Sequence, residues 1–316
     1  AKRFQGIVAV IECKRLFEHL DNDHTVESFQ SNLVCHQDGT CNGLQHMAAI
    51  TGDRNTAIAV NCTAAKTSDL PTDIYKLVAD AAADAAENKA VKSLIEKYGR
   101  DMSKNPVMIT GYGAGADTVK DNTAAFLRKP KNEGSAKFGA ECGEAYIEGI
   151  SQVASAVYNL TNILKLNAQS AIEEGARTFS WVTADGFKVT TKYIDKEGNR
   201  IRAGGFASLV PALKGSVFDE VKTIGALPPN FVHSIDSTHL RAVVNTSNYD
   251  LVTVHDSIGS HAGNYAATSR SVRETFVNVH NYEALENLCD SMGQPCPEFE
   301  GDYKAEEALQ APYIFS

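Results

Sequence analysis

Two aspartates in this sequence have surroundings that suit metal chemistry. Asp38 follows a short apolar stretch at residues 32–34, and Asp256 follows the apolar run at residues 251–254. A strand that ends in a turn presents its last side chains at the edge of a sheet. Two carboxylates placed in this way suit a pair of Mg²⁺ ions, because this cation takes oxygen ligands and leaves positions for substrate phosphates. An isolated aspartate at a strand end more commonly caps a turn, and spacing alone leaves both interpretations open.

A second set of chemically useful residues recurs every four positions. Arg100, Lys104, Met108 and Tyr112 would share one face of a helix, because four residues make slightly more than one turn. The two cations could bind a triphosphate, while the methionine and the tyrosine could lie beside a base and a sugar. The simpler alternative is a solvated charged face with Met108 and Tyr112 in the core. Pro106 lies within this stretch, and we expect it to kink or tighten the helix.

Apolar periodicity predicts the elements that carry these groups. Hydrophobic spacing indicates helices, and alternation between turn residues indicates strands. The sequence predicts helices over residues 4–20, from a cap at Ser68 or Asp69 to about Asn88, from residue 103 or earlier to 111, over 138–173, from about 236 and over 266–287, together with a β-hairpin at 178–193 and a strand at 251–255. The mixture of helices and short strands predicts an α+β fold.

Composition excludes several classes of protein. A hydrophobic fraction of 43% and no apolar stretch near the about 20 residues of a membrane helix predict a soluble chain with no membrane partner. The net charge of −9 argues against a protein that coats nucleic acid nonspecifically, because such a protein needs a broad basic surface. Residues 92–131 are locally basic, so we expect phosphates to bind there. Seven cysteines without CxxC pairs predict reduced thiols in an intracellular compartment.

The beginning of the chain predicts that it is part of a longer protein. The first residue is Ala1, and neither an initiator methionine nor a secretory segment precedes the helix predicted at residues 4–20.

Four motifs occur in the order seen in single-subunit DNA-directed RNA polymerases of the bacteriophage and mitochondrial type. They are His36–His46, Arg100–Gly113, Pro229–Leu240 and Val254–Ser257. Residues 61–75 and 181–186 are also similar to that family, as is the aromatic terminus at residues 313–316. The chain therefore resembles the carboxy-terminal palm and fingers region of these enzymes, and the likeness begins at about residue 30.

The resemblance implies a right-hand polymerase fold, with an antiparallel palm sheet and a mostly helical fingers insertion. Residues 1–62 would be the first part of the palm, with Asp38. Residues 63–230 would be the fingers, including a region at 192–222 that occupies the place of the promoter-recognising hairpin. Residues 231–316 would be the second part of the palm, with Asp256, and the carboxy-terminal tail. The thumb and the promoter-binding region of such a polymerase would lie upstream.

The resemblance also implies a metal centre. Asp38 and Asp256 would be ligands of two Mg²⁺ ions, with the carbonyl of Gly39 as an additional ligand. His255 would help to position the end of the growing RNA. The reaction implied is template-dependent transfer of ribonucleoside monophosphates from NTPs to an RNA 3′-hydroxyl, with release of pyrophosphate.

Other matching residues would bind the incoming nucleotide. Arg100 and Lys104 would bind its triphosphate, and Lys104 would also stabilise or protonate the departing pyrophosphate. Met108 would lie beside the templating base. Tyr112, together with Gly113, would govern ribose acceptance and translocation.

Two further residues complete the implied nucleotide site. His233 would approach the 2′-hydroxyl, which distinguishes RNA precursors from DNA precursors, and Tyr75 would pack near the triphosphate. The partners implied are a DNA template, nascent RNA and NTPs. The location implied is the cytoplasm of an infected cell for a viral enzyme, and the mitochondrial matrix or a plastid for an organellar one.

Competing interpretations are weaker. A family A DNA polymerase shares the arginine, lysine and tyrosine of the helix, but it has phenylalanine in place of Met108 and glutamate in place of Ser257. A catalytically inactive descendant that only binds nucleic acid is disfavoured because both acids, the lysine and the tyrosine are present. A dinucleotide-binding loop at residues 111–115 lacks the complete glycine fingerprint. The thiols of Cys35 and Cys41 more simply pack in the interior than bind zinc.

Overall fold

The fold is a mixture of helices and small antiparallel sheets, which confirms the predicted α+β class. The computed structural model describes residues 3–64, 70–129, 136–195, 198–203, 206–211 and 217–315. The helices are α1 (Arg3–Asp21), α2 (Asn42–Thr51), α3 (Arg54–Ala59), α4 (Ile74–Ala85), α5 (Lys89–Gly111), α6 (Ala116–Leu127), α7 (Gly139–Val153), α8 (Ser155–Glu173), α9 (Glu220–Thr246), α10 (Tyr265–His280) and α11 (Ala284–Met292). The strands are β1 (Val34–Gln37), β2 (Phe179–Val182), β3 (Lys188–Thr191), β4 (Ile194–Asp195), β5 (Gly198–Ala203), β6 (Phe206–Pro211), β7 (Val217–Phe218), β8 (Val252–Val254) and β9 (Ser257–His261).

A three-stranded antiparallel sheet joins the two halves of the sequence. Its strand order is β1-β9-β8, and β1 pairs with β9 from Val34 opposite His261 to Gln37 opposite Ile258. Strands β8 and β9 form a hairpin in which Val254 pairs with Ser257. The sheet therefore brings the segment after β1 next to a turn that lies more than two hundred residues further along the chain.

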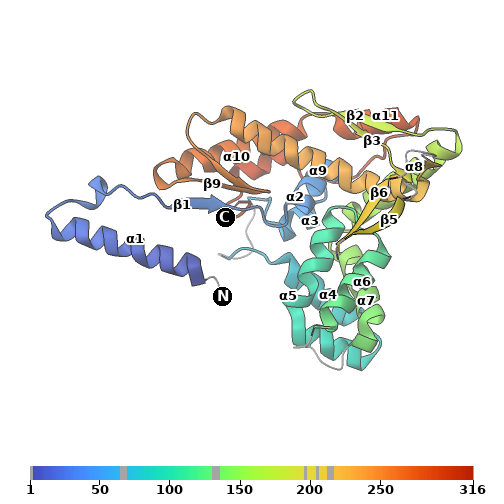
Figure 1. Cartoon of the computed structure of the whole chain (residues 1–316), viewed down its shortest axis with the longest axis horizontal. Helices are drawn as coiled ribbons and strands as arrows, with labels where there is room; N and C mark the ends of the chain where they lie inside the picture. The colour runs from blue at the N-terminus through green and yellow to red at the C-terminus, as the bar shows by residue number, and fades with distance from the viewer. Residues whose placement is uncertain are drawn as a thin grey trace.

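Helices α4 to α7 form a separate block below α2, α9 and α10 in the view of Figure 1. Helix α4 packs against both α5 and α7, and its alanine-rich face includes Ala79, Ala82 and Ala83, all buried. Small residues allow close approach: a Cβ on Gly149 of α7 would lie 2.8 Å from the backbone nitrogen of Ala82. This helical block lies between the two segments of the sheet in sequence.

Several predicted helix bounds differ from the structure. Helix α9 begins at Glu220 and not at about residue 236, and the predicted helices over residues 138–173 and 266–287 are each divided into two helices. Helix α4 begins at Ile74, with Asp73 as its N-cap, while the predicted caps Ser68 and Asp69 lie outside the described residues. Helix α5 continues through Pro106, and its non-helical residue is Gly99, with φ 43° and ψ −123°. The break occurs at Gly99 because glycine adopts positive φ easily.

The main core lies beneath the sheet and between helices α2, α8, α9 and α10. Leu44, Met47, Phe231 and Phe276 are among its fully buried side chains. The predicted hairpin is confirmed as β2 and β3, and the indole of Trp181 packs into this core. Its Nε1–H donates to Ser234 Oγ at 2.9 Å, which satisfies the polar end of a buried aromatic ring.

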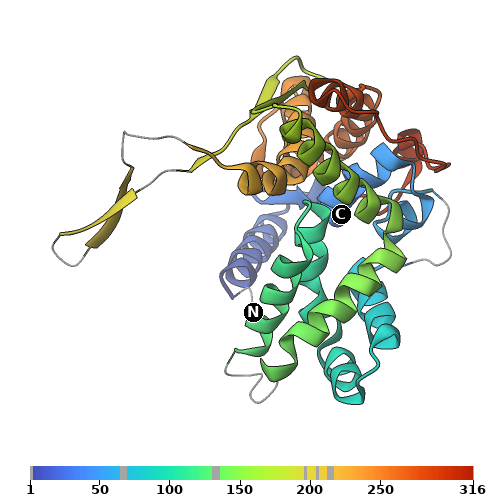
Figure 2. The same cartoon turned by 90° about the vertical axis from the view of Figure 1, so that its right-hand side faces the viewer.

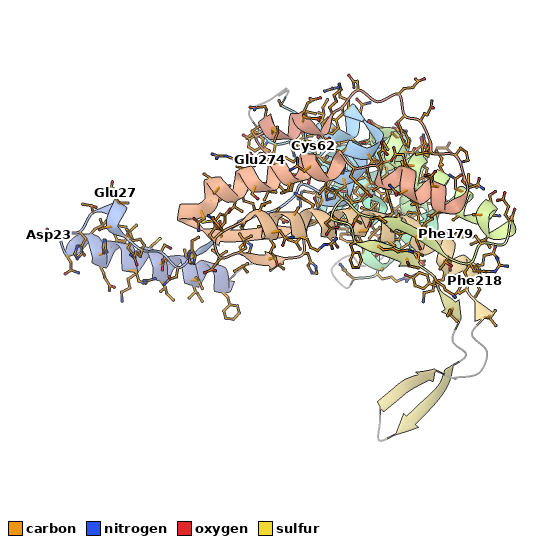
Figure 3. The ribbon with its side chains drawn as sticks, turned by 90° about the horizontal axis from the view of Figure 1, so that it is seen from above. Asp23, Glu27, Cys62, Phe179, Phe218 and Glu274 are labelled. Atoms are coloured by element: carbon orange, nitrogen blue, oxygen red, sulfur yellow. The ribbon has the colours of Figure 1, made fainter. Side chains whose placement is uncertain are left out.

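Two segments project from the body. Strands β4 and β7 pair at the base of a long hairpin, and β5 pairs with β6 beyond it; Figure 2 shows this hairpin extending away from the helices. Part of the region predicted to recognise promoters, residues 196–197, 204–205 and 212–216, lies outside the described residues. Helix α1 also stands apart from the core (Figure 3). In the described part of the chain, no helix has the length and apolar character needed to span a membrane.

The carboxy-terminal tail is built into the turn that follows β1. Gln45 Nε2 donates to the carbonyl of Ile314 at 2.8 Å, and the Thr40 hydroxyl donates to the carbonyl of Tyr313 at 3.2 Å. Gly39 forms an isolated β-bridge with Phe315. The tail thus supports the backbone directly after Asp38.

Replacement of Phe315 by alanine should lower the free energy of unfolding by about 3 kcal/mol. Its ring is only 4% exposed and lies against Phe276 and His239, so truncation leaves a cavity. Denaturant unfolding measures the change, and Leu309→Ala in the same tail is the control because Leu309 is 42% exposed. Equal effects of the two substitutions would contradict this account of the tail.

Candidate active site

Asp38 and Asp256 lie at neighbouring positions of the three-stranded sheet. Asp38 directly follows β1, and the β1–β9 register continued by one residue places it opposite Ser257. Because Val254 pairs with Ser257, the β8–β9 turn consists of His255 and Asp256. The backbone of His255 has a φ of 56°. Tight hairpin turns require this left-handed conformation, which residues other than glycine rarely adopt.

The two carboxylates repel each other. Burial raises the pKa of Asp256, and the nearby charges of Asp38 and Asp236 raise it further. Neighbouring negative charges favour the binding of a cation, which would relieve the repulsion between them. Within the described ranges, no group of three or more His, Cys, Asp or Glu side chains is arranged to hold a metal ion. Any ion here would need oxygen ligands from the backbone, water or a substrate as well, which is usual for Mg²⁺.

The amino-terminal part of the predicted helix face carries its two cations. Arg100 Nε donates to Asp73 Oδ2 at 2.7 Å, and its guanidinium lies 5.1 Å from the centre of the Tyr75 ring. Lys104 is exposed one turn further along, and no ion pair of its ammonium group occurs in the part of the chain that the structure describes. Its charge is close enough to act on the thiol of Cys41 at the start of α2.

The carboxy-terminal part of the same face carries Tyr112. Its ring stacks on His233 of α9, with ring centres 4.5 Å apart and an angle of 26° between planes. Burial raises the pKa of the phenol, and the charges of Asp236 and Asp256 raise it further, while the nearby Gly43 backbone acts weakly in the opposite direction. Tyr112 therefore stays protonated and lies within the electrostatic reach of the carboxylates.

Gly113 has a structural reason to be glycine. Its φ is +79°, and it ends α5 with two hydrogen bonds, from Gly113 N–H to the Thr110 carbonyl and from Ala114 N–H to the Ile109 carbonyl. These are the bonds of a Schellman motif. A Cβ at Gly113 would also lie 2.6 Å from Cβ of Pro228. Gly113 therefore ends α5 and allows its close approach to α9.

A cavity of about 850 Å³ lies beside this stack. Its lining includes Met108, Tyr112, Gly113 and His233, together with Lys165 of α8. Burial lowers the pKa of the Lys165 ammonium group. Met108 is partly exposed to this cavity and not enclosed in the core, which agrees with a face available to a ligand.

Asp236 lies three residues after His233 on α9 and had no predicted role. Its Oδ1 accepts a hydrogen bond from Asn42 Nδ2 at 2.6 Å and lies 3.8 Å from Nε2 of the buried His46. Burial disfavours its charge, but the contact with His46 and the nearby His239 and His233 lower its pKa overall. The spacing of residues 233, 236 and 239 on one helix face was the signal available in the sequence.

Cys41 is a second residue without a predicted role at this site. It begins α2 in a left-handed conformation, with φ 59°, and its side chain hydrogen-bonds the hydroxyl of Tyr75. Burial raises the pKa of its thiol to about 11. Cys41 therefore connects the start of α2 to α4 as a neutral thiol, and all seven cysteines are free.

The predicted site residues thus come together from five elements. One series of contacts or electrostatic effects links Asp38 to Asp256, Asp256 to Tyr112, and Tyr112 to His233. A second series links Lys104 to Cys41, Cys41 to Tyr75, and Tyr75 to Arg100. His255 adjoins Asp256 in the same turn, and Gly39 follows Asp38. The arrangement combines a paired carboxylate centre with a cationic and aromatic helix face.

A family model described as DNA-dependent RNA polymerase matches residues 1–311. The chain belongs to this family. The fourfold spacing on α5 and the strand-end aspartates are therefore features of an RNA polymerase family member, as the resemblance indicated.

Plant organellar RNA polymerases are among its relatives. The DNA-directed RNA polymerase 1B, mitochondrial, of Nicotiana tabacum is 29% identical over 92% of this chain and 31% of the relative. The DNA-directed RNA polymerase 3, chloroplastic, of Nicotiana sylvestris is 28% identical over 99% of the chain and 34% of the relative. The chain thus spans about a third of the length of these two. A shorter relative, DNA-directed RNA polymerase 2A of Nicotiana tabacum, is 29% identical over 92% of the chain and 94% of the relative.

In this polymerase-family chain, Gly113→Ala should destabilise the protein more than Gly186→Ala does. Both glycines have nearly the same φ, +79° and +81°, but a Cβ at Gly186 would meet nothing within 4 Å. Gly186→Ala, the control, should lower the free energy of unfolding only by the cost of positive φ, about 1 kcal/mol. Gly113→Ala adds the clash with Pro228, which should lower it by about 1–3 kcal/mol more. Denaturant unfolding of both variants measures the difference. Equal losses would show that the contact between α5 and α9 is not tight.

Proposed function

We propose that this chain is the catalytic part of a DNA-directed RNA polymerase. The reaction is template-directed attack of an RNA 3′-hydroxyl on the α-phosphate of a ribonucleoside triphosphate, with pyrophosphate as the leaving group. The observation that supports it most strongly is the placement of Asp38 and Asp256 side by side, with Asp256 within electrostatic reach of Tyr112 on the α5 face. The family match favours this reaction over the DNA polymerase alternative.

Asp38 and Asp256, with the carbonyl of Gly39, would hold two Mg²⁺ ions. The raised pKa of Asp256 supports the fit, because burial first and the charge of Asp38 second disfavour its carboxylate form, and a cation at the pair would offset both. The chemistry that such ions would supply at this place is activation of the attacking oxygen and stabilisation of the leaving one. The carboxylates contribute the negative charge and the orientation, and His255 beside them would position the RNA 3′ end.

Arg100 and Lys104 would bind the triphosphate. They lie one turn apart on α5, and both side chains are largely exposed. Guanidinium and ammonium groups bind phosphate oxygens strongly when they are already oriented. Lys104 would also neutralise the charge that develops on pyrophosphate, or donate a proton to it.

Tyr112 and His233 would contact the sugar of the incoming nucleotide and select ribose. Their stacked rings line the cavity next to Met108, which would lie beside the templating base, and Gly113 fixes the end of the helix that carries Tyr112. Tyr75 would pack near the triphosphate. A 2′-hydroxyl can both donate and accept hydrogen bonds, so a polar pair at this place can select ribose.

The architecture supports division into palm and fingers. The palm would comprise residues 1–62 and 231–316, which share the three-stranded sheet, and the fingers would comprise residues 63–230, which contain the α4–α7 block. The hairpin within residues 192–222 would contact promoter DNA. The remaining two thirds of the longer relatives would supply the thumb and the promoter-binding region, and the names of these relatives support a mitochondrial or plastid location.

Asp38→Asn and Asp256→Asn should each reduce RNA elongation by at least about 100-fold, because each removes a carboxylate ligand of the metal ions. Primer extension on an RNA–DNA scaffold with Mg²⁺ measures the rate. Thermal unfolding midpoints should stay the same or rise, since each substitution removes one of two repelling charges. Asp290→Asn, a surface substitution on α11, is the control. Near-normal elongation by either variant would exclude the metal assignment.

Tyr112→Phe should lower the preference for ribonucleotides over deoxynucleotides by about tenfold, because it removes the hydroxyl and keeps the stacked ring. The measurement is the ratio of kcat/KM for the two nucleotide types. Tyr146→Phe is a matched control, since Tyr146 is buried in α7 and its hydroxyl has no hydrogen-bond partner in the described structure. An unchanged ratio in Tyr112→Phe would remove Tyr112 from ribose selection.

A further inference from the structure

Asp73 uses its two carboxylate oxygens for two different purposes. Oδ1 accepts hydrogen bonds from the backbone N–H groups of Tyr75 and Lys76, at 3.0 and 3.3 Å, and so caps the first turn of α4. Oδ2 accepts the hydrogen bond from Arg100 Nε at 2.7 Å. The cap fixes the carboxylate to the helix, and the carboxylate in turn fixes the guanidinium of a different helix.

Arg100 is restrained on a second side. Its guanidinium lies over the ring of Tyr75, at 5.1 Å from the ring centre, and the Tyr75 hydroxyl is held by Cys41. Cation–π contact and a carboxylate at Nε restrict both the plane and the rotation of the guanidinium. Within the described ranges, the terminal nitrogens Nη1 and Nη2 make no hydrogen bond, so both remain available to a ligand.

We infer that Asp73 is a positioning residue for the nucleotide triphosphate, acting through Arg100. This inference rests on the proposed function, and it adds a residue to which neither the sequence motifs nor the family match assigns a role. Asp73 holds Nε, Tyr75 supports the plane, and Nη1 and Nη2 bind phosphate oxygens. A side chain ordered before the ligand arrives loses less conformational entropy on binding.

The contact has little importance for stability. The side chains of Arg100 and Asp73 are 51% and 37% exposed, and ion pairs with this exposure contribute little to folding. Asparagine is as good an N-cap as aspartate. Asp73→Asn can therefore keep the cap of α4 while it removes the charged acceptor of Arg100, which separates positioning from folding.

The test is nucleotide-concentration dependence of primer extension by the naturally expressed protein and its Asp73→Asn variant. We expect KM for the ribonucleotide to rise by about 3- to 10-fold, because a less ordered Arg100 loses more conformational entropy when it binds phosphate, with kcat within about twofold of the original. A latch that must release Arg100 before nucleotide binds would have the opposite effect, a lower KM. A lower or unchanged KM overturns the inference.

Two comparisons show whether Asp73 acts through Arg100. In an Arg100→Ala background, Asp73→Asn should have no further effect on KM, because the group that it positions is absent. Glu144→Gln is the matched control: it breaks the 2.8 Å ion pair between Lys120 and Glu144, which lies between α6 and α7, and it should leave KM unchanged. Additive effects of the Asp73 and Arg100 substitutions would overturn the inference.

A second measurement does not depend on catalysis. Phenylglyoxal modifies guanidinium groups, and peptide mass spectrometry gives its rate at Arg100. Asp73→Asn should increase this rate at Arg100 and leave it unchanged at Arg54, which is paired with Asp302 and Glu307. An unchanged rate at Arg100 shows that Asp73 does not hold it. If the unsubstituted protein fails to extend RNA, the proposed function fails and this role falls with it, whereas normal extension with an unchanged KM in Asp73→Asn removes only this inference.

Discussion

Repulsion between two carboxylates is the constraint around which the rest of the site is arranged. Asp38 and Asp256 are brought together by the register of β1 and β9 and by a two-residue turn in which His255 adopts a left-handed conformation. Such a placement is unfavourable without a cation. It is maintained because several independent contacts restrain the surrounding backbone. The carboxy-terminal tail contributes directly: it bonds to Thr40 and Gln45 and pairs with Gly39. Residues at the end of the chain thus hold a carboxylate near its beginning.

The helix face depends on close packing between helices. A Cβ at Gly43 of α2 would lie 3.0 Å from the carbonyl oxygen of Gly111, and one at Gly111 would lie 3.1 Å from Leu44. This approach of α2 to α5 places the backbone of Gly43 beside the Tyr112 ring, and the Schellman motif at Gly113 then turns the chain against Pro228. The tyrosine is therefore positioned by backbone contacts on two sides. Side-chain packing alone would leave it more freedom.

Much of the site could be predicted from local patterns, because its parts are local. The strand-end aspartates, the fourfold spacing on α5 and the β2–β3 hairpin are each visible in one short segment, but the roles of the site residues followed only from the resemblance of four motifs to the polymerase family. The break in α5 was expected at Pro106 and occurs at Gly99. A proline within a helix removes only one backbone hydrogen bond, whereas a residue with positive φ cannot belong to a right-handed helix. Asp236 had no predicted role because its partner Asn42 is 194 residues away. Asp73 had none because its contact with Arg100 depends on how α4 packs against α5.

Burial of the phenol, together with the charges of Asp236 and Asp256, keeps Tyr112 protonated. Burial lowers the pKa of His239 to about 4, and the pKa of His280 is also well below its ordinary value, so neither provides a positive charge. Asp236 remains ionised through its contacts with Asn42 and His46, and its charge adds to that of Asp256 in raising the pKa of Tyr112. The phenol therefore stays neutral. A neutral phenol keeps its O–H donor as well as its acceptor lone pairs, which is the hydrogen-bonding character that recognition of a sugar hydroxyl requires.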